Sequence, residues 1–334
     1  MDTNLAGKNI ILISPRYFNY ETEIKEALEK KGAYVHYIND RIKDSTLNKA
    51  QFRLNLQGKR GRKRVLMYFD EHLKQATNER EIDYLIAIIP EGFSKEIIEY
   101  YKAKLKNTIF ILYMWDSIEN RPYILDTLSL YDRTYTFDKN NSVKYNLTFR
   151  PLFYTDEYYW IGQAPANFEY DLSFIGTAHS DRYIVIKNLL ESAGKKLNTF
   201  LFFYLQHPLV ALYYKLTDPE FKKVKIKDVS FNGLSKQNVL RIIEKSRCVI
   251  DINHPKQTGL TIRTLEVLGA RRKLITTNSD IVNYDFYNAN NILVIERQNP
   301  NLLESFLQIP YEPLDNELYN RYSISSWIND VLSL

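Results

Sequence analysis

The sequence predicts an α/β protein with two domains, each built on a parallel β-sheet that helices cover on both faces. Short apolar runs alternate with helical segments along residues 9–151, and the alternation restarts after an aromatic and polar stretch at residues 154–170. The apolar runs are nearly continuous, which is typical of strands buried on both faces of a parallel sheet. The length of 334 residues suits two domains of about 150 residues each.

Six short segments, four of them apolar runs, predict the strands of the first domain. They are residues 9–14, 34–38, 84–89, 108–114, 132–137 and 148–151. The segments between them have helical periodicity, with Ser94 as an expected N-cap and with breaks near Gly58 and Gly61 in the longest segment. The expected helices are residues 21–31, 45–79, 94–104 and a segment after Asp138.

The second domain repeats this pattern. Its expected strands are residues 170–175, 197–204, 229–231, 248–252, 273–277 and 292–295. Its expected helices are residues 181–193, residues 236–246 and a helix that opens at Gly259. Residues 318–334 have the spacing of an amphipathic helix, with Tyr322, Trp327 and Ile328 on its apolar face.

These elements give an explicit domain organisation. We expect a Rossmann-like domain at residues 1–153, a linker at residues 154–170 and a second Rossmann-like domain at residues 171–315. The last segment, residues 316–334, is expected to be a helix that crosses back and packs on the first domain. Two such domains are expected to face a cleft at the carboxyl ends of their strands.

Composition restricts the class of protein further. The apolar fraction of 45% and the charged fraction of 25% are ordinary for a soluble globular protein. No apolar run approaches the roughly 18 residues that a membrane span needs, and the N-terminus lacks the pattern of a secretory signal. The single cysteine, Cys248, lies in an apolar run and is expected to be an inert buried thiol. A cytoplasmic protein is therefore expected.

The positive charge is concentrated in the first half of the chain. Residues 1–150 carry 25 Lys and Arg against 20 Asp and Glu, which accounts for the whole net charge of +5. The densest part is a basic cluster made of Lys59, Arg60, Arg62, Lys63 and Arg64. Two interpretations stay open: a solvated loop or helix end, or a surface that meets anionic phospholipid or a lipid-diphosphate acceptor. No nucleic-acid-binding motif accompanies it, so nucleic acid is not an expected partner.

One stretch of the second domain has the chemistry of a binding site. Residues 249–278, VIDINHPKQTGLTIRTLEVLGARRKLITTN, form an expected strand, a polar loop, a helix opened by Gly259 and a second strand. Backbone amides at the start of such a helix can meet a phosphate. Glu266, near the end of the helix, carries a carboxylate that can reach a sugar hydroxyl. A nucleotide sugar needs both groups.

The same stretch, with the upstream FNGLSKQNVLRIIEKSRCVIDIN, resembles the donor half of glycosyltransferases that have two Rossmann-like domains, the GT-B architecture. The resemblance implies that Glu266 binds the nucleotide ribose and that Gly259 forms the turn. It also places Thr258 where retaining members have a Glu that touches the donor sugar. Because Thr258 has no carboxylate, the anomeric outcome stays open.

A second motif, FIGTAHSDR, begins the second domain. Its strand ends in Gly176 and Thr177 before a helix, which leaves backbone amides and a hydroxyl at a usual place for a diphosphate. His179 or Arg182 could add positive charge there.

Other basic residues are candidates for the same site or its surroundings. Lys256 and Arg263 could pair with phosphate, although Arg263 could instead form an ion pair with Glu266, three residues further along the helix. His254 lies in the loop before this helix and could face the cleft or shape the loop. Arg16, directly after the first strand, could hold an anionic acceptor or a phosphate, or could be structural.

The catalytic candidate belongs to the first domain. Asp116, in YMWDSIENRP, follows a strand and could be the base that removes the acceptor proton in an inverting reaction, or it could cap a helix or hold Arg121. With SLYDRTYTFDKNNSVKYNLTFRPLFY and YDLSFIGT, this region resembles polysaccharide-building bacterial glycosyltransferases of the CgeB-type and group 1 kind. That resemblance implies a nucleotide-sugar donor and a saccharide or lipid-linked saccharide acceptor in capsule, exopolysaccharide or lipopolysaccharide assembly.

No metal or other cofactor is expected, because the sequence has no DxD motif and the nucleotide sugar is itself the substrate. Two alternatives stay open. One is a non-catalytic binding or coat-associated protein that retains the two-domain shape. The other is a different enzyme with two Rossmann-like domains, such as a sugar-nucleotide epimerase.

Overall fold

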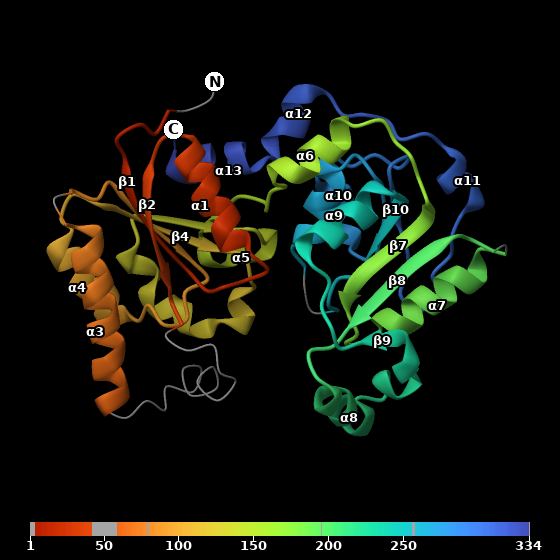
Figure 1. The fold of residues 1–334 in the computed structure, drawn as a ribbon, viewed down its shortest axis with the longest axis horizontal. Coiled ribbons are helices and arrows are strands. Elements are labelled where there is room, and N and C mark those ends of the chain that lie inside the picture. Colours follow the sequence, from red (N-terminus) through yellow and green to blue (C-terminus); the bar gives the residue numbers. More distant parts are fainter. Residues whose placement is uncertain (1–3, 42–58, 79, 195, 256–257, 334) are drawn as a thin grey trace. The chain divides into compact units, whose positions relative to one another are not determined.

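The structure, a computed structural model, describes residues 4–41, 59–78, 80–194, 196–255 and 258–333. The chain forms two compact units (Figure 1). Unit 1 comprises the chain up to Pro151 together with Ile324–Leu334, and unit 2 comprises Leu152–Ser323. Each unit has a six-stranded sheet, and every described strand pairing is parallel. The predicted α/β class with two Rossmann-like domains is therefore confirmed.

The sheet of unit 1 has the order β2-β1-β3-β4-β5-β6. Its strands are β1 (Asn9–Ser14), β2 (Tyr34–Asn39), β3 (Tyr84–Ile88), β4 (Ile109–Met114), β5 (Arg133–Thr136) and β6 (Thr148–Phe149). Its helices are α1 (Tyr20–Lys30), α3 (Lys59–Ala76), α4 (Lys95–Lys104), α5 (Lys139–Tyr145) and α13 (Ile324–Leu332), with the 3-10 helices η1 (Ile118–Asn120) and η2 (Pro122–Leu130).

The sheet of unit 2 has the order β12-β11-β10-β7-β8-β9. Its strands are β7 (Tyr170–Thr177), β8 (Thr199–Tyr204), β9 (Val229–Ser230), β10 (Ser246–Asp251), β11 (Lys273–Thr276) and β12 (Ile292–Val294). Its helices are α6 (Asp156–Gln163), α7 (Arg182–Ser192), α8 (Pro208–Thr217), α9 (Lys236–Glu244), α10 (Ile262–Gly269), α11 (Glu304–Gln308) and α12 (Asn316–Arg321), with the 3-10 helices η3 (Phe221–Lys223), η4 (Ile226–Asp228) and η5 (Ser279–Asn283).

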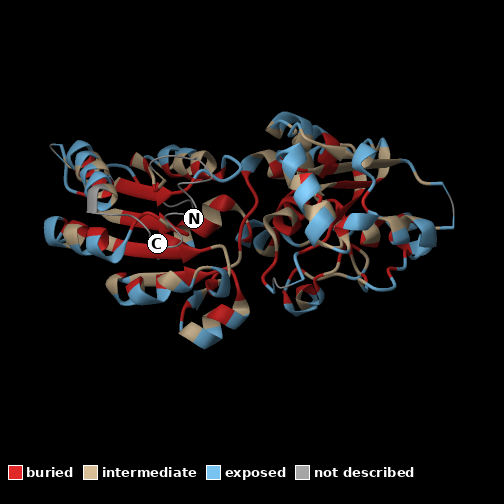
Figure 2. Ribbon diagram, turned by 90° about the horizontal axis from the view of Figure 1, so that it is seen from below, coloured by how far each residue is buried: buried red, intermediate tan, exposed pale blue. Residues whose placement is uncertain are grey.

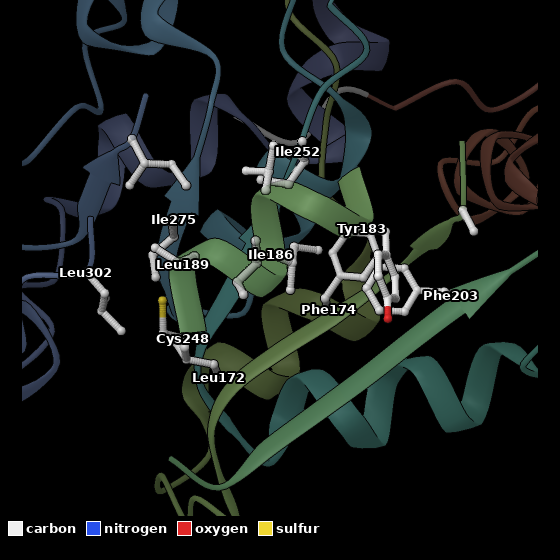
Figure 3. Packing of buried hydrophobic residues seen from close by; sticks show 14 of the residues in the cluster. Leu172, Phe174, Tyr183, Ile186, Leu189, Phe203, Cys248, Ile252, Ile275 and Leu302 are labelled. Carbon is white, nitrogen blue, oxygen red and sulfur yellow. The ribbon is translucent and has the colours of Figure 1, made fainter. Parts of the chain in front are cut away.

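Within each unit the central strands are largely buried, whereas most exposed residues lie on helices and loops (Figure 2). The core of unit 2 groups the rings of Phe174, Tyr183 and Phe203 (Figure 3), whose centroids are 5.0 Å apart for Phe174 and Phe203 and 5.1 Å apart for Tyr183 and Phe203. A Cβ on Gly176 would lie 2.7 Å from the Phe174 ring, so a larger residue there would force the ring to shift. Cys248 is fully buried in the same core, and burial raises the pKa of its thiol, as expected of an inert thiol.

The stretch expected as a linker, residues 154–170, contains a helix instead. This helix, α6, packs on α10 within unit 2. Tyr154 and Tyr319 stack beside them with ring centroids 5.0 Å apart, and the Tyr319 hydroxyl donates to the carbonyl oxygen of Gly269 at 2.5 Å. The aromatic residues that suggested a change of composition are thus part of a packed layer.

The C-terminal segment, residues 316–334, forms two helices rather than one. Asp315 caps α12 by accepting from the amide of Leu318 at 2.9 Å, and α12 belongs to unit 2. The chain then leaves the helix, and the carbonyl oxygen of Tyr322 accepts from the amide of Tyr154 at 2.9 Å. Only α13 belongs to unit 1.

Helix α13 completes the core of unit 1. Trp327 is fully buried and meets the Tyr113 ring edge to face, with centroids 4.8 Å apart. Arg150 forms an ion pair with Asp330 at 2.6 Å, and Arg133 donates to the carbonyl oxygen of Leu332 at 2.6 Å.

Two other helix predictions differ from the structure. The helix expected at residues 45–79 lies partly outside the described residues, and its described part, α3, continues through Gly61 without the expected break. Helix α8 was not predicted, because its sequence, PLVALYYKLT, is apolar on both faces and lacks clear helical periodicity.

We predict that Gly269→Ala lowers the free energy of unfolding by about 1–3 kcal/mol, because the added methyl group overpacks the contact between α10 and Tyr154. A Cβ on Gly269 would lie 2.5 Å from the Tyr154 ring. Urea unfolding measures the change. Gly233→Ala is the matched control, since its Cβ would meet nothing closer than 3.9 Å. Equal stability of the two variants would contradict the role assigned to Gly269.

Candidate functional site

The topology of unit 2 indicates where a ligand would bind. Successive strands run outward from β7 in one direction, to β8 and β9, and from β10 in the other, to β11 and β12. This is the strand order of the Rossmann fold, in which ligands bind at the carboxyl ends of the two strands where the order reverses. Those strands are β7 and β10, so the loops that follow them form the candidate site.

Arg182 joins these two loops. Its Nε donates to the carbonyl oxygen of Ile252 at 2.7 Å, and its Nη1 donates to the Thr177 hydroxyl at 2.9 Å. The sequence suggested that Arg182 adds positive charge for a diphosphate. In the structure its guanidinium fixes the ends of both loops, so Arg182 is first a positioning residue.

His179 and His254, one from each loop, lie close together. Their ring centroids are 5.7 Å apart, and His254 is exposed whereas His179 is half-buried. Burial, with a smaller effect of Arg182 and His254, lowers the pKa of His179 to about 4. His179 is therefore neutral at neutral pH and does not carry the positive charge that the sequence suggested.

The start of α10 is tied to the end of β10. The buried carboxylate of Asp251 accepts from the hydroxyls of Thr261 at 2.5 Å and Thr264 at 2.8 Å. The side-chain Nδ2 of Asn278 donates to the carbonyl oxygens of Thr258 at 3.0 Å and Gly259 at 3.3 Å. Asp251 and Asn278 therefore hold the start of α10 and the turn before it, where the sequence predicts a phosphate-binding turn.

Arg297, which follows β12, contacts the same two loops. One of its nitrogens, Nη1, pairs with Asp181 at 2.8 Å, and Nη2 donates to the Asn253 side-chain oxygen at 2.7 Å. Thr277 donates to that same oxygen at 2.7 Å. Sequence reasoning missed Asp251, Asn253, Asn278 and Arg297. The available signal was that each follows or ends a strand of one parallel sheet, which brings them to one edge.

Glu266 is buried, with 5% of its surface exposed. Its carboxylate forms an ion pair with Arg263 at 2.6 Å, which is the intrahelical pair left open by the sequence. Burial and the nearby Glu266 charge raise the pKa of Tyr158, which comes from α6. The carboxylate is therefore held in one orientation between α10 and α6.

The remaining donor-site candidates lie at the end of β7, in the loop before α10 or outside the described residues. Gly176 and Thr177 end β7, and Thr258 is exposed on the loop before α10, with Gly259 buried beside it. Lys256 lies outside the described residues.

In unit 1, Asp116 contacts the turn that follows it. Its Oδ1 accepts from the amide of Ser117 at 2.9 Å and from Asn120 at 3.1 Å, and its Oδ2 pairs with Arg121 at 3.0 Å. These are the capping and arginine-holding contacts that the sequence left open beside the role of a base. The side chain of Asp116 keeps 31% of its surface exposed.

Arg121 continues a chain of ion pairs at the same edge of the sheet. It also pairs with Glu91, which pairs in turn with Arg41 at 2.9 Å. Sequence reasoning missed Glu91 and Arg41, which follow β3 and β2. Arg16, after β1, is exposed on the same edge.

Buried Asp40 fixes the loop that carries Glu91. It accepts from the amides of Glu91 and Gly92, the latter at 3.1 Å. Burial raises the pKa of Asp40 to about 6.

No group of three or more His, Cys, Asp or Glu side chains among the described residues is placed to hold a metal ion. No helix within the described ranges is long and apolar enough to cross a membrane.

Two Rossmann-like units with a C-terminal helix that returns to the first one define a protein of the GT-B fold class. The structure is similar to a glycosyltransferase from Rickettsia africae ESF-5, with 12% identity, a TM-score of 0.58 and coverage of 98% of this chain and 99% of that one. It is also similar to HepE of Anabaena in complex with UDP and glucose, with 11% identity, a TM-score of 0.57 and coverage of 97% and 99%.

A third similar structure is UDP-GlcNAc 2-epimerase from Neisseria meningitidis bound to UDP-GlcNAc, with 11% identity, a TM-score of 0.52 and coverage of 97% and 98%. No family model and no curated protein matches the sequence. At these identities the similarity establishes the fold, and the function has to be argued from the site.

The low pKa of His179 gives a stability prediction. Between about pH 4 and pH 6.5 the unfolded chain binds a proton at this position that the folded chain does not, so the free energy of unfolding falls as the pH falls through this window. His179→Gln should remove up to about 1.4 kcal/mol per pH unit from that slope, measured by urea unfolding.

Comparison with wild type near pH 8, where the imidazole is neutral in both states, isolates the packing cost of the His179 substitution. His36 and His72 in unit 1, whose pKa values burial also lowers, contribute with the same sign and stay in both proteins. An unchanged slope in the variant would contradict the assigned pKa of His179.

Proposed function

We propose that the protein is a glycosyltransferase that moves a sugar from a nucleotide-sugar donor to a saccharide or lipid-linked saccharide acceptor. The observation that carries the proposal is the convergence of the β7 and β10 loops at the strand reversal of unit 2, fixed by Arg182 and Arg297. The similarity of the fold to HepE, solved in complex with UDP and glucose, supports the same choice of ligand.

In this proposal unit 2 binds the donor. Gly176, Thr177 and the start of α10 face the diphosphate, because backbone amides at a helix start and beside a parallel strand suit an anion. Glu266 binds the ribose hydroxyls, and its pairing with Arg263 sets the direction of the carboxylate. His254 contributes a hydrogen bond from the loop.

Unit 1 supplies the acceptor side. Asp116 is the proposed base that accepts the proton of the acceptor hydroxyl, and its ion pair with Arg121 fixes the position of the carboxylate. Arg16 is a proposed contact for an anionic acceptor. We propose that no metal takes part and that hydrogen-bond donors and helix amides stabilise the leaving diphosphate.

The biological setting is part of the same proposal. The acceptor belongs to capsule, exopolysaccharide or lipopolysaccharide assembly in the cytoplasm, with peripheral contact to anionic membrane. Arg62, Lys63 and Arg64 of the basic cluster are exposed on α3, which is compatible with such contact.

An epimerase is the second candidate, because the similar Neisseria structure is a UDP-GlcNAc 2-epimerase. Product analysis separates the candidates: a transferase releases nucleoside diphosphate and glycosylates an acceptor, whereas an epimerase returns an isomeric nucleotide sugar. A binding protein would give neither product.

A thermal-shift panel of UDP-, GDP-, CMP- and dTDP-linked sugars tests donor binding. A ligand that binds only the folded state stabilises it by about 2.7 kcal/mol at a hundredfold excess over its Kd, which is readily measured. We predict that one nucleotide of the panel stabilises the protein. Absence of any shift across the panel would contradict the proposal.

We predict that His254→Ala and Glu266→Gln each weaken binding of that nucleotide about tenfold or more, the effect of removing a hydrogen bond to a charged partner, measured by titration calorimetry. His254 is exposed, so its loss should leave folding intact. His207→Ala, another exposed histidine of unit 2, is the matched control. Unchanged affinity in both test variants would remove the donor site from the β10 loop and α10.

We predict that Asp116→Asn preserves nucleotide affinity and lowers turnover at least about a hundredfold, because the amide cannot accept the proton. Asp132→Asn is the matched control, since Asp132 is also a carboxylate paired with a cation, Lys102, at 3.2 Å, but precedes its strand. Full turnover in Asp116→Asn would assign Asp116 only the role of holding Arg121 and its turn.

A further inference from the structure

Helix α8 of unit 2 exposes an apolar face. Four of its side chains point to solvent at the spacing i, i+3, i+4 and i+7, which places them on one side of the helix. This α8 face consists of Leu209 (67% exposed), Leu212 (57%), Tyr213 (61%) and Leu216 (71%). Single exposed apolar residues are ordinary, but a contiguous face of four large ones marks an interaction surface.

The opposite side of α8 is already packed on the domain. Ala211 is buried, and Val210 and Tyr214 pack against the core of unit 2. The Tyr214 ring lies 5.4 Å from the ring of Phe221, which is fully buried. The helix is therefore fixed in orientation with its apolar α8 face outward, at the periphery of the unit (Figure 1).

A run of lysines lies alongside this face. The Lys215 side chain donates to the carbonyl oxygens of Lys222 at 2.8 Å and Val224 at 2.6 Å, which binds the following segment to α8. That segment carries the lysine run, in which all four side chains are exposed: Lys222, Lys223, Lys225 and Lys227.

Two of the three nearby acidic residues, Asp218 and Asp228, accept hydrogen bonds from neighbouring groups of unit 2. Asp218 accepts from the amides of Glu220 and Phe221, and Asp228 accepts from the Tyr183 hydroxyl at 2.6 Å. Glu220 pairs with Lys223 at 3.0 Å. The lysine run therefore keeps a net positive potential next to the apolar α8 face.

We propose that the α8 face and the lysine run together dock unit 2 on an anionic phospholipid surface. Leucine side chains enter the boundary between headgroups and acyl chains, and a tyrosine is suited to that depth because it is apolar with a polar tip. Lysines beside them meet the anionic headgroups. A second copy of the chain fits less well, because a two-fold contact through this face would bring the two lysine runs together.

The α8 face and the lysine run share no residue with the basic cluster on α3 or with the donor-site candidates, and docking requires no catalytic activity. The test uses the full chain without nucleotide, sedimented with vesicles of phosphatidylcholine or of equal parts phosphatidylcholine and phosphatidylglycerol. We expect binding at least about tenfold stronger to the anionic vesicles, and weaker at high salt.

Two variants separate the contributions. Leu212→Ser with Leu216→Ser should weaken binding to anionic vesicles at least about tenfold by removing apolar side chains from the acyl boundary. Lys222→Gln with Lys225→Gln should weaken it about tenfold or more and flatten its salt dependence. Both variants should melt like wild type, since all four positions are exposed.

The controls define what would overturn the proposal. Val282→Ser with Leu303→Ser changes two exposed apolar residues elsewhere in unit 2 and should leave binding unchanged. Arg62→Gln with Lys63→Gln and Arg64→Gln tests the basic cluster. Full vesicle binding in both α8 variants, or no preference of the wild type for anionic vesicles, overturns the proposal. So does a wild-type dimer that the leucine variant converts to a monomer without any change in vesicle binding.

Discussion

The alignment of β7 with β10 is the constraint on which the candidate site depends. The two strands are parallel and in register, with Cys248 opposite Leu172 and Val249 opposite Ser173. A buried hydrogen bond of 2.7 Å between the hydroxyls of Ser246 and Ser173 joins the same pair of strands. Because the strands run in the same direction, their following loops emerge at one edge, and the contacts of Arg182 and Arg297 can then fix both loops.

Much of the fold was predictable from the sequence, because most of the central buried strands are nearly continuous apolar runs. The errors occurred where helices are short or uniformly apolar. Helix α6 was hidden in an aromatic stretch, and its packing depends on the close approach of Gly162 and Gly269, which lie more than a hundred residues apart. The break between α12 and α13 coincides with the backbone hydrogen bond from Tyr154 to Tyr322, two residues far apart in the sequence.

The site was predictable only in part. Local spacing correctly suggested the pair of Arg263 with Glu266, because residues three apart on a helix are neighbours. Spacing could not show where Arg182 points, since a long side chain reaches partners on any adjacent loop. Arg297 meets Asp181 across 116 positions of sequence and Asn253 across 44, and only the folded sheet brings them together.

The distribution of charge restricts how an anion could be held at the carboxyl edge of unit 2. The guanidinium groups of Arg182 and Arg297 contact loop oxygens, Arg263 pairs with Glu266, and burial leaves His179 neutral. Among the described residues of unit 2, a diphosphate at this edge would therefore meet mainly backbone amides, hydroxyls and imidazole, in a frame that the arginines fix. Such a frame suits charge that develops during a reaction, because preorganised dipoles do not have to reorient when the leaving group departs.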